Sequence, residues 1–162
     1  MTNIHEMKAA LQKYSDSRQQ LINSLQHLMS LRNKISYVSA DMLRKQGAVT
    51  MKSSRLTFQL SDSIDSATMD CKEKLLELSR AVSYVKELTL AKDNNSFVDE
   101  SYMAALVSEL EQQYILECSI TEGLCSNPTV EIDQDSVTSM MACFEYPPYL
   151  SDAKLEAFLL TC

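Results

Sequence analysis

The chain has 162 residues, of which 45% are hydrophobic, and it carries a formal net charge of −7. That hydrophobic fraction is too high for a wholly disordered chain. Two glycines and three prolines are too few for a β-rich fold with many tight turns. The sequence therefore predicts an all-α protein: an elongated coiled coil or helical bundle with long N-terminal helices and a short helical C-terminal hook.

Membrane and disulfide signals are both weak. No apolar run approaches the roughly 18 residues that a membrane-spanning helix needs, and the N-terminus shows no basic-then-apolar signal peptide. The five cysteines are irregularly spaced and form no C-x-x-C pair, which argues against a disulfide framework. We therefore expect a chain without a transmembrane segment, located in the cytoplasm or nucleus with reduced thiols.

Residues 1–92 contain no proline and a single glycine, Gly47. Within them, positions spaced alternately by three and four residues are mostly apolar, which is the heptad spacing of a coiled coil. The first such stripe runs through Ile4, Met7, Leu11, Tyr14, Arg18, Leu21, Leu25, Leu28, Arg32 and Ile35. The second runs through Ile64, Ala67, Cys71, Leu75, Leu78, Val82, Val85 and Leu88. Leu56, Leu60 and Ile64 are spaced by four and four, a stutter that shifts the stripe between the two stretches.

Such a stripe must be covered by another helix, and the first hypothesis is that other coiled-coil chains cover it. The residues expected to carry this partner interface are Leu11, Leu21, Leu25, Leu28, Ile35, Leu75, Leu78, Val82 and Val85.

Arg18 and Arg32 occupy positions in the first stripe where a charged side chain is costly. They either lie at the edge of the stripe and extend into water, or they meet acidic groups at matching heights on a partner. Two identical parallel helices would place arginine against arginine. A hetero-oligomer or an antiparallel partner is therefore favoured over a parallel homodimer.

Gly47 follows Arg44 and Lys45, a pattern typical of a helix C-terminus. Two architectures remain open here. The chain may turn near residues 46–53 and form a helical hairpin, or Gly47 may be tolerated at about 1 kcal/mol within one long helix. A bend or break is slightly favoured.

Charge is distributed unequally along the chain. Residues 1–92 contain 14 Lys or Arg and 9 Asp or Glu, whereas residues 93–162 contain one lysine, Lys154, and 13 acidic residues. The acidic segment may fold back on the basic one, face a basic partner, or simply keep a helical tail soluble.

Residues 93–124 are expected to form a third packing helix after a loop at 93–96. Ser96 and Asp99 resemble a capping box, the wide apolar face includes Leu106, Leu110 and either Leu116 or Glu117, and Gly123 is expected to end the helix. Asn3 is the expected cap of the first helix.

Residues 125–162 are expected to form an acidic C-terminal hook. A loop or short strand should precede a short helix capped by Asp133 or Asp135, and a last short helix should begin at Ser151 or Asp152. The hook may pack on its own chain, or it may dock into a groove on another protein. Its docking residues would be Phe144, Tyr146, Tyr149 and Phe158.

Enzyme and nucleic-acid signals are missing. His5 and His27 are too far apart on one helix to share a metal ion, and no phosphate loop, nucleophile elbow, zinc-protease or EF-hand motif occurs. We expect no catalytic residue, cofactor or metal site. Net negative charge without interleaved basic and aromatic residues argues against nucleic acid. The basic first helix could instead contact an acidic surface.

The heptad pattern over residues 3–121 resembles, in general character only, small coiled-coil subunits of large eukaryotic assemblies. It carries no residue-level correspondence. The expected function is a non-enzymatic structural subunit of a hetero-oligomeric intracellular assembly of the spindle, kinetochore or cytoskeletal type. The alternative is a self-contained helical-bundle adaptor in vesicle tethering or membrane trafficking.

Overall fold

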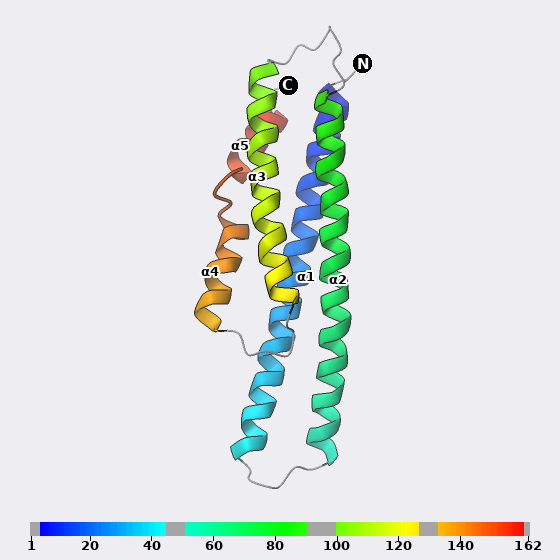
Figure 1. Ribbon diagram of the computed structural model, residues 1–162, viewed down its shortest axis with the longest axis vertical. Helices are drawn as coiled ribbons and strands as arrows, with labels where there is room; N and C mark the ends of the chain where they lie inside the picture. Colours follow the sequence, from blue (N-terminus) through cyan, green and yellow to red (C-terminus); the bar gives the residue numbers. More distant parts are fainter. Residues whose placement is uncertain (1–3, 45–50, 91–99, 127–132, 161–162) are drawn as a thin grey trace.

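The computed structural model describes residues 4–44, 51–90, 100–126 and 133–160, and every regular element in these ranges is an α-helix. The all-α fold expected from the sequence is therefore confirmed. The helices form one elongated bundle in which two long helices run the full length and three shorter ones cover part of it (Figure 1). Their bounds are α1 Ile4–Arg44, α2 Met51–Leu90, α3 Glu100–Cys125, α4 Gln134–Glu145 and α5 Asp152–Leu160.

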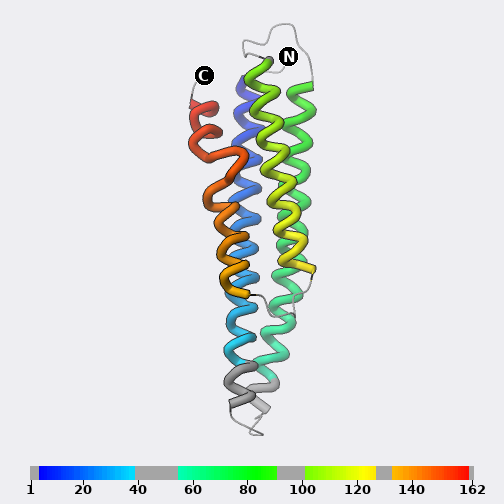
Figure 2. The backbone as a smooth tube through the Cα atoms, turned by 60° about the vertical axis from the view of Figure 1, so that its left-hand side comes forward, coloured from blue at the N-terminus to red at the C-terminus, as the bar shows by residue number. Residues whose placement is uncertain are grey.

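Helices α1 and α2 pack against each other along their whole length and run in opposite directions (Figures 1 and 2). The Ser24 hydroxyl donates to an Asp70 carboxylate oxygen at 2.7 Å, which fixes the register of the pair. The chain thus forms a hairpin instead of one continuous helix, and the reversal falls between Arg44 and Met51. Gly47, and the expected caps and loop at Asn3, Ser96, Asp99 and 93–96, lie outside the described residues.

Helix α3 is the third long member of the bundle and packs mainly on α2. It continues through Gly123 to Cys125, so the expectation that this glycine ends the helix is wrong. A Cβ atom at Gly123 would meet nothing within 4 Å. The glycine is therefore an exposed residue inside the helix, where its cost of about 1 kcal/mol is too small to outweigh the packing of the last turn.

Two short helices complete the bundle, as expected for the hook. Asp133 caps α4 by accepting from the Asp135 backbone N–H, and α4 ends at Glu145, two residues before Pro147. The Ser151 hydroxyl oxygen accepts from the Lys154 backbone N–H at 3.2 Å and so caps α5. The expected loop or short strand falls largely at 127–132, outside the described residues.

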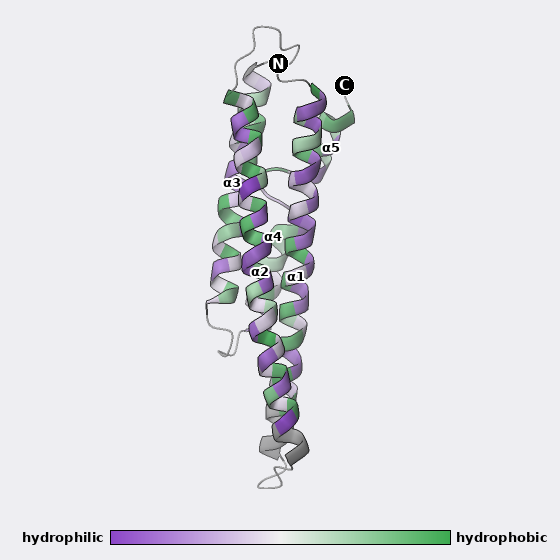
Figure 3. Ribbon diagram, turned by 90° about the vertical axis from the view of Figure 1, so that its right-hand side faces the viewer, coloured by the Kyte–Doolittle hydropathy of each residue, from purple (hydrophilic) through white to green (hydrophobic). Residues whose placement is uncertain are grey.

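The core lies between α1, α2 and α3. Leucines at alternating steps of three and four on α1 and α2 are fully covered, and each contributes roughly 1.5–3 kcal/mol by leaving water. Apolar and polar residues are intermixed along the outer faces of both long helices (Figure 3). The heptad stripe therefore has a partner in this fold, namely the chain's own helices.

Candidate functional site

Helices α3 and α4 stop well short of the end at which α1 and α2 are joined (Figures 1 and 2). The C-terminal end of α3 is marked by Arg32, whose guanidinium donates to the Leu124 carbonyl oxygen at 3.0 Å. The first turn of α4 is marked by a hydrogen bond from the Gln134 amide to Asn33. Beyond these contacts α1 and α2 continue as a pair. We call residues 34–44 of α1 and 51–61 of α2 the distal arm.

The described side chains of the distal arm include three large apolar residues that are exposed. Tyr37 is 79% exposed, Phe58 is 74% exposed and Leu56 is 44% exposed. Ile35 and Leu60 are only half-buried, although they continue the heptad stripes that are fully covered elsewhere. A two-helix pair cannot bury both of its apolar stripes as a three-helix core does, which leaves this surface available for contact.

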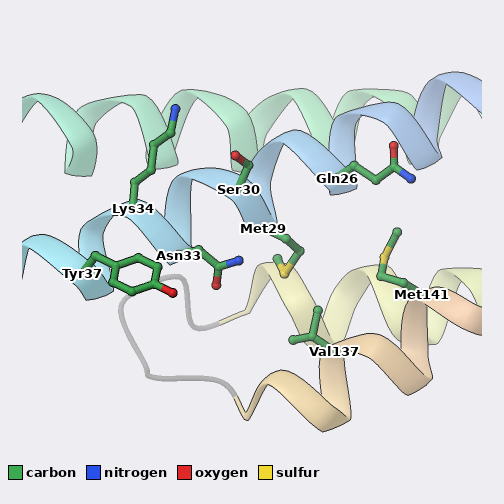
Figure 4. A pocket seen from close by; sticks show the side chains of 8 residues that line it. All are labelled: Gln26, Met29, Ser30, Asn33, Lys34, Tyr37, Val137 and Met141. Carbon is green, nitrogen blue, oxygen red and sulfur yellow. The ribbon is translucent and has the colours of Figure 1, made fainter.

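An open hollow of about 420 Å³ lies where the arm meets the first turns of α4. Met29, Asn33 and Tyr37 of α1 line it opposite Val137 and Met141 of α4 (Figure 4). Methionine side chains adapt their shape readily, so such a hollow suits an apolar side chain from another molecule. The hollow therefore extends the apolar surface of the arm toward the body of the bundle.

A buried polar cluster connects the helices in the half of the molecule that lies away from the distal arm. The Arg18 guanidinium on α1 donates to the Glu117 carboxylate on α3 at 2.5 Å, and it also donates to the Phe144 carbonyl oxygen at the end of α4. It lies 3.5 Å from the Asp152 carboxylate on α5. One cation thus contacts the three helices α3, α4 and α5, which makes it a clasp for the C-terminal hook.

Gln113 completes this clasp. Its side-chain amide donates to Glu117 at 3.0 Å, and its carbonyl oxygen accepts from the Tyr149 backbone N–H at 3.2 Å. Burial raises the pKa of the Glu117 carboxyl, an effect that Arg18 and Gln113 partly oppose. Burial also raises the pKa of Tyr14, with the Glu117 charge adding to the effect. Arg18, Gln113 and Glu117 are buried and only Asp152 is exposed, so the cluster can hold helices together but is poorly placed to act on a dissolved substrate.

A pair of thiols lies close to the end of α3. Cys71 on α2 and Cys125 on α3 are both buried, and hydrogen bonding between the two thiols raises the pKa of Cys71 and lowers that of Cys125. Arg32 is buried beside them, and burial lowers the pKa of its guanidinium. The prediction that Cys71 lies on the apolar stripe agrees with this position.

The structure resolves the alternatives left open for the two stripe arginines. Neither extends into water, since Arg18 and Arg32 are 7% and 8% exposed. Arg18 meets an acid at matching height, and that acid, Glu117, belongs to the same chain. Together with the ion pair Lys86–Glu111 at 2.6 Å, this shows that the described acidic half folds back on the basic half. A further ion pair, Lys154–Glu109, joins α5 to α3 within the acidic half.

The residues expected at a partner interface lie together, on facing sides of α1 and α2. In the isolated chain they are covered by its own helices: seven are buried and two, Ile35 and Leu75, are partly buried. The seven are Leu11, Leu21, Leu25, Leu28, Leu78, Val82 and Val85. Their role toward another protein stays a prediction, and an additional chain would reach the more exposed end of the stripe, near Ile35, first.

The hook residues divide into two groups. Phe144 and Phe158 are buried in the chain's own core, and the Phe158 ring stacks on Tyr102 with a centroid distance of 5.9 Å. Tyr146 is 78% exposed and Tyr149 is 47% exposed. Only the two tyrosines are therefore placed to contact another molecule without unfolding the hook.

Sequence reasoning missed the clasp residues Gln113 and Glu117. Their signal was their position: both continue the spacing of the buried leucines Leu106 and Leu110 on α3. Of the two alternatives for the wide apolar face, Glu117 is the fully buried residue and Leu116 is half-buried. A polar residue at a core position of one helix indicates a polar group at the facing position of another, which here is Arg18.

No family model, curated protein or solved structure matches this chain. Within the described residues, no group of three or more His, Cys, Asp or Glu side chains could hold a metal ion. In the same ranges, no helix is long and apolar enough to span a bilayer. The arm and its hollow are thus the strongest candidate site.

Proposed function

We propose that this chain is a non-enzymatic structural subunit that assembles with other helical chains through its distal arm. The observation that carries the proposal is the difference in length between the helices: the heptad stripes of α1 and α2 run beyond the ends of α3 and α4, and the apolar residues there are exposed. A partner helix that packed over Ile35 and Leu60 would complete their cover and bury Leu56. Phe58 lies on the other side of α2, so a second partner helix would be needed to bury it.

That the assembly is hetero-oligomeric stays the prediction made from the sequence, since Arg18 and Arg32 are satisfied within the chain and no longer distinguish a second copy from a different partner. An intracellular assembly of the spindle, kinetochore or cytoskeletal type stays the prediction made from the general character of the sequence. The proposed role requires no cofactor and no catalytic residue.

A second candidate function is a self-contained helical-bundle adaptor in vesicle tethering or membrane trafficking. One observation favours it: the core between α1, α2 and α3 is complete without any other chain. A folded monomer is compatible with both functions. The two differ in the surface that they need, since an adaptor could use the exposed Tyr146 and Tyr149 of the hook and leave the arm free.

The test compares proteins that co-purify with three versions of the tagged chain. The arm variant carries Tyr37→Glu and Phe58→Glu. The control carries Leu76→Glu and Tyr84→Glu, two exposed apolar residues on the body of α2 that are 52% and 44% exposed. Leu25 and Leu78 are unsuitable here, because charges at these buried positions would unfold the bundle.

We expect the arm variant to lose its helical partners by roughly tenfold or more, as for removal of interface hot spots, while the control retains them. Circular dichroism should show equal helicity for all three proteins. Retention of every partner by the arm variant would refute the proposal. Loss of partners only with Tyr146→Ala and Tyr149→Ala would favour the adaptor.

A further inference from the structure

The groove between α1 and α2 already holds one acidic helix. Residues 100–125, which form α3, contain five glutamates and no lysine or arginine. Two of these glutamates reach basic residues of the long helices: Glu111 lies 2.6 Å from Lys86 of α2, and Glu117 accepts from Arg18 of α1. The hairpin therefore presents cations at the heights where an acidic helix packs on it.

The hairpin continues past the end of α3, and the charged side chains described there are basic. Residues 34–61 contain five lysines or arginines and one acidic residue, Asp41, in a chain whose overall net charge is −7. The structure describes two of these cations, Lys34 and Arg55, and both are exposed. Among the described side chains of the arm none is acidic, so its field is positive against the negative field of the rest of the surface.

Apolar residues accompany these charges. Ile35 of α1 and Leu60 of α2 continue the stripes that α3 covers higher in the bundle, and they are half-buried. Leu56, one turn before Leu60 on the same face of α2, adds exposed apolar surface. A helix with one apolar face and acidic flanks satisfies both features, as α3 does along the body.

From this continuity and charge complementarity we infer that the occupant of the arm is an acidic amphipathic helix of another protein. It packs on the α1–α2 hairpin end to end with α3 and follows it beyond Arg32. The inference rests on the proposed function and names the chemistry of the partner. A protein helix is chosen over an anionic bilayer because the body of the same hairpin already holds an acidic amphipathic helix, α3, through Lys86 and Arg18.

The first experiment uses two synthetic peptides as probes. One is a fluorescein-labelled peptide with the sequence of residues 100–124 and Cys118→Ser, which stands in for an acidic amphipathic helix. The other has its five glutamates replaced by lysine. Fluorescence anisotropy is measured against the full chain and against two charge variants, Lys34→Glu with Arg55→Glu in the arm and Lys13→Glu with Arg80→Glu on exposed positions of the body.

We expect saturable binding of the acidic peptide and at least tenfold weaker binding of the lysine peptide. The arm variant should weaken binding of the acidic peptide by about tenfold, and raising the salt from 0.05 M to 0.3 M should weaken it further because exposed charges are screened. The body variant should bind as the wild-type chain does. Equal binding of both peptides, or binding that the arm charges do not affect, would overturn the inference.

Two further measurements test other occupants. Flotation of the chain with phosphatidylserine vesicles, lost in the arm variant and without peptide binding, would assign the arm to a lipid surface. A dimer seen by light scattering that the arm variant dissociates would assign it to a second copy. Either result overturns the inference.

Failure of the inference can be separated from failure of the proposed function. If partners are lost with Tyr37→Glu and Phe58→Glu but retained with Lys34→Glu and Arg55→Glu, the arm docks helical partners whose chemistry is not acidic. If neither pair of substitutions changes the partners, both proposals fail.

Discussion

The body and the distal arm are built from the same two helices, yet they differ in what covers them. In the body, α3, α4 and α5 lie against α1 and α2, leucines such as Leu25 are 0% exposed and even Arg18 is buried with partners. In the arm the positions that continue these stripes are less covered: Ile35 and Leu60 are half-buried and Leu56 is 44% exposed. The difference shows that a heptad stripe specifies that a helix will be covered but does not specify which helix covers it.

A matched pair of leucine substitutions tests this comparison most strongly. Leu25→Ala in the body should lower the free energy of unfolding by about 3–5 kcal/mol, because it removes buried methyl groups and leaves a cavity. Leu56→Ala in the arm should lower it by less than about 1 kcal/mol, since that side chain is already 44% exposed. Denaturant unfolding of the purified chain measures both values.

Similar losses of unfolding free energy for Leu25→Ala and Leu56→Ala would contradict this comparison. They would mean that the arm is covered in the isolated chain, for example by a second copy. The concentration dependence of unfolding distinguishes that case, because a dimer becomes more stable at higher protein concentration and a monomer does not.

The clasp supports a second prediction of similar or slightly smaller size. Arg18→Ala leaves Glu117 buried and unpaired, and such a change typically costs about 3–5 kcal/mol. The double substitution Arg18→Met with Glu117→Leu removes both charges and should recover most of that loss. The arm cation Arg55, which is exposed, should change stability by less than about 0.5 kcal/mol when replaced by alanine.

Denaturant unfolding of these variants, with hydrogen exchange of α4 and α5, measures the effect. If Arg18→Ala acts as the clasp predicts, exchange should rise most in the hook. A loss of stability spread evenly over all helices would instead assign Arg18 to the general packing of α1. If the double substitution is no more stable than the single one, buried charge is not the cause of the loss.

The parts of this fold that depend on local pattern could be predicted from the sequence. Low proline and glycine content and heptad spacing predicted long helices within residues 1–92, but left open whether they form a hairpin or one continuous helix. Residue type alone narrowed each of the last two helix caps to a pair of candidates, and in each pair the first, Asp133 or Ser151, is the observed cap. The prediction that Gly123 ends α3 was wrong because helix propensity is a weak preference, and the packing of the last turn of α3 overrides it.

The parts that depend on distance in the chain could not be predicted. Arg18 and Glu117 are 99 residues apart, and their pairing depends on how α3 is aligned along α1. The sequence gives the charges but not this alignment. The candidate site has the same origin: α3 ends beside Arg32, the stripe positions Ile35 and Leu60 beyond it are half-buried, and nothing in residues 51–61 records where α3 ends.

The third prediction is the smallest in effect and concerns the pH dependence of the body. Burial raises the pKa of Glu117 above its ordinary value of 4.5, so the folded chain binds a proton at this site more tightly than the unfolded chain does. The stability contributed by this site is therefore greatest at low pH and falls as the pH rises from 4.5 through the raised pKa.

Glutamine cannot titrate, so Glu117→Gln removes this dependence. The unfolding free energy of the wild-type chain minus that of Glu117→Gln should thus decrease as the pH rises from 4.5 to 7. If attraction to Arg18 outweighed burial, the pKa would be lowered instead, and the difference would increase as the pH rises through the acidic range. The sign of this slope decides whether the body keeps its buried carboxyl mainly as a neutral hydrogen-bonding group or as a member of an ion pair.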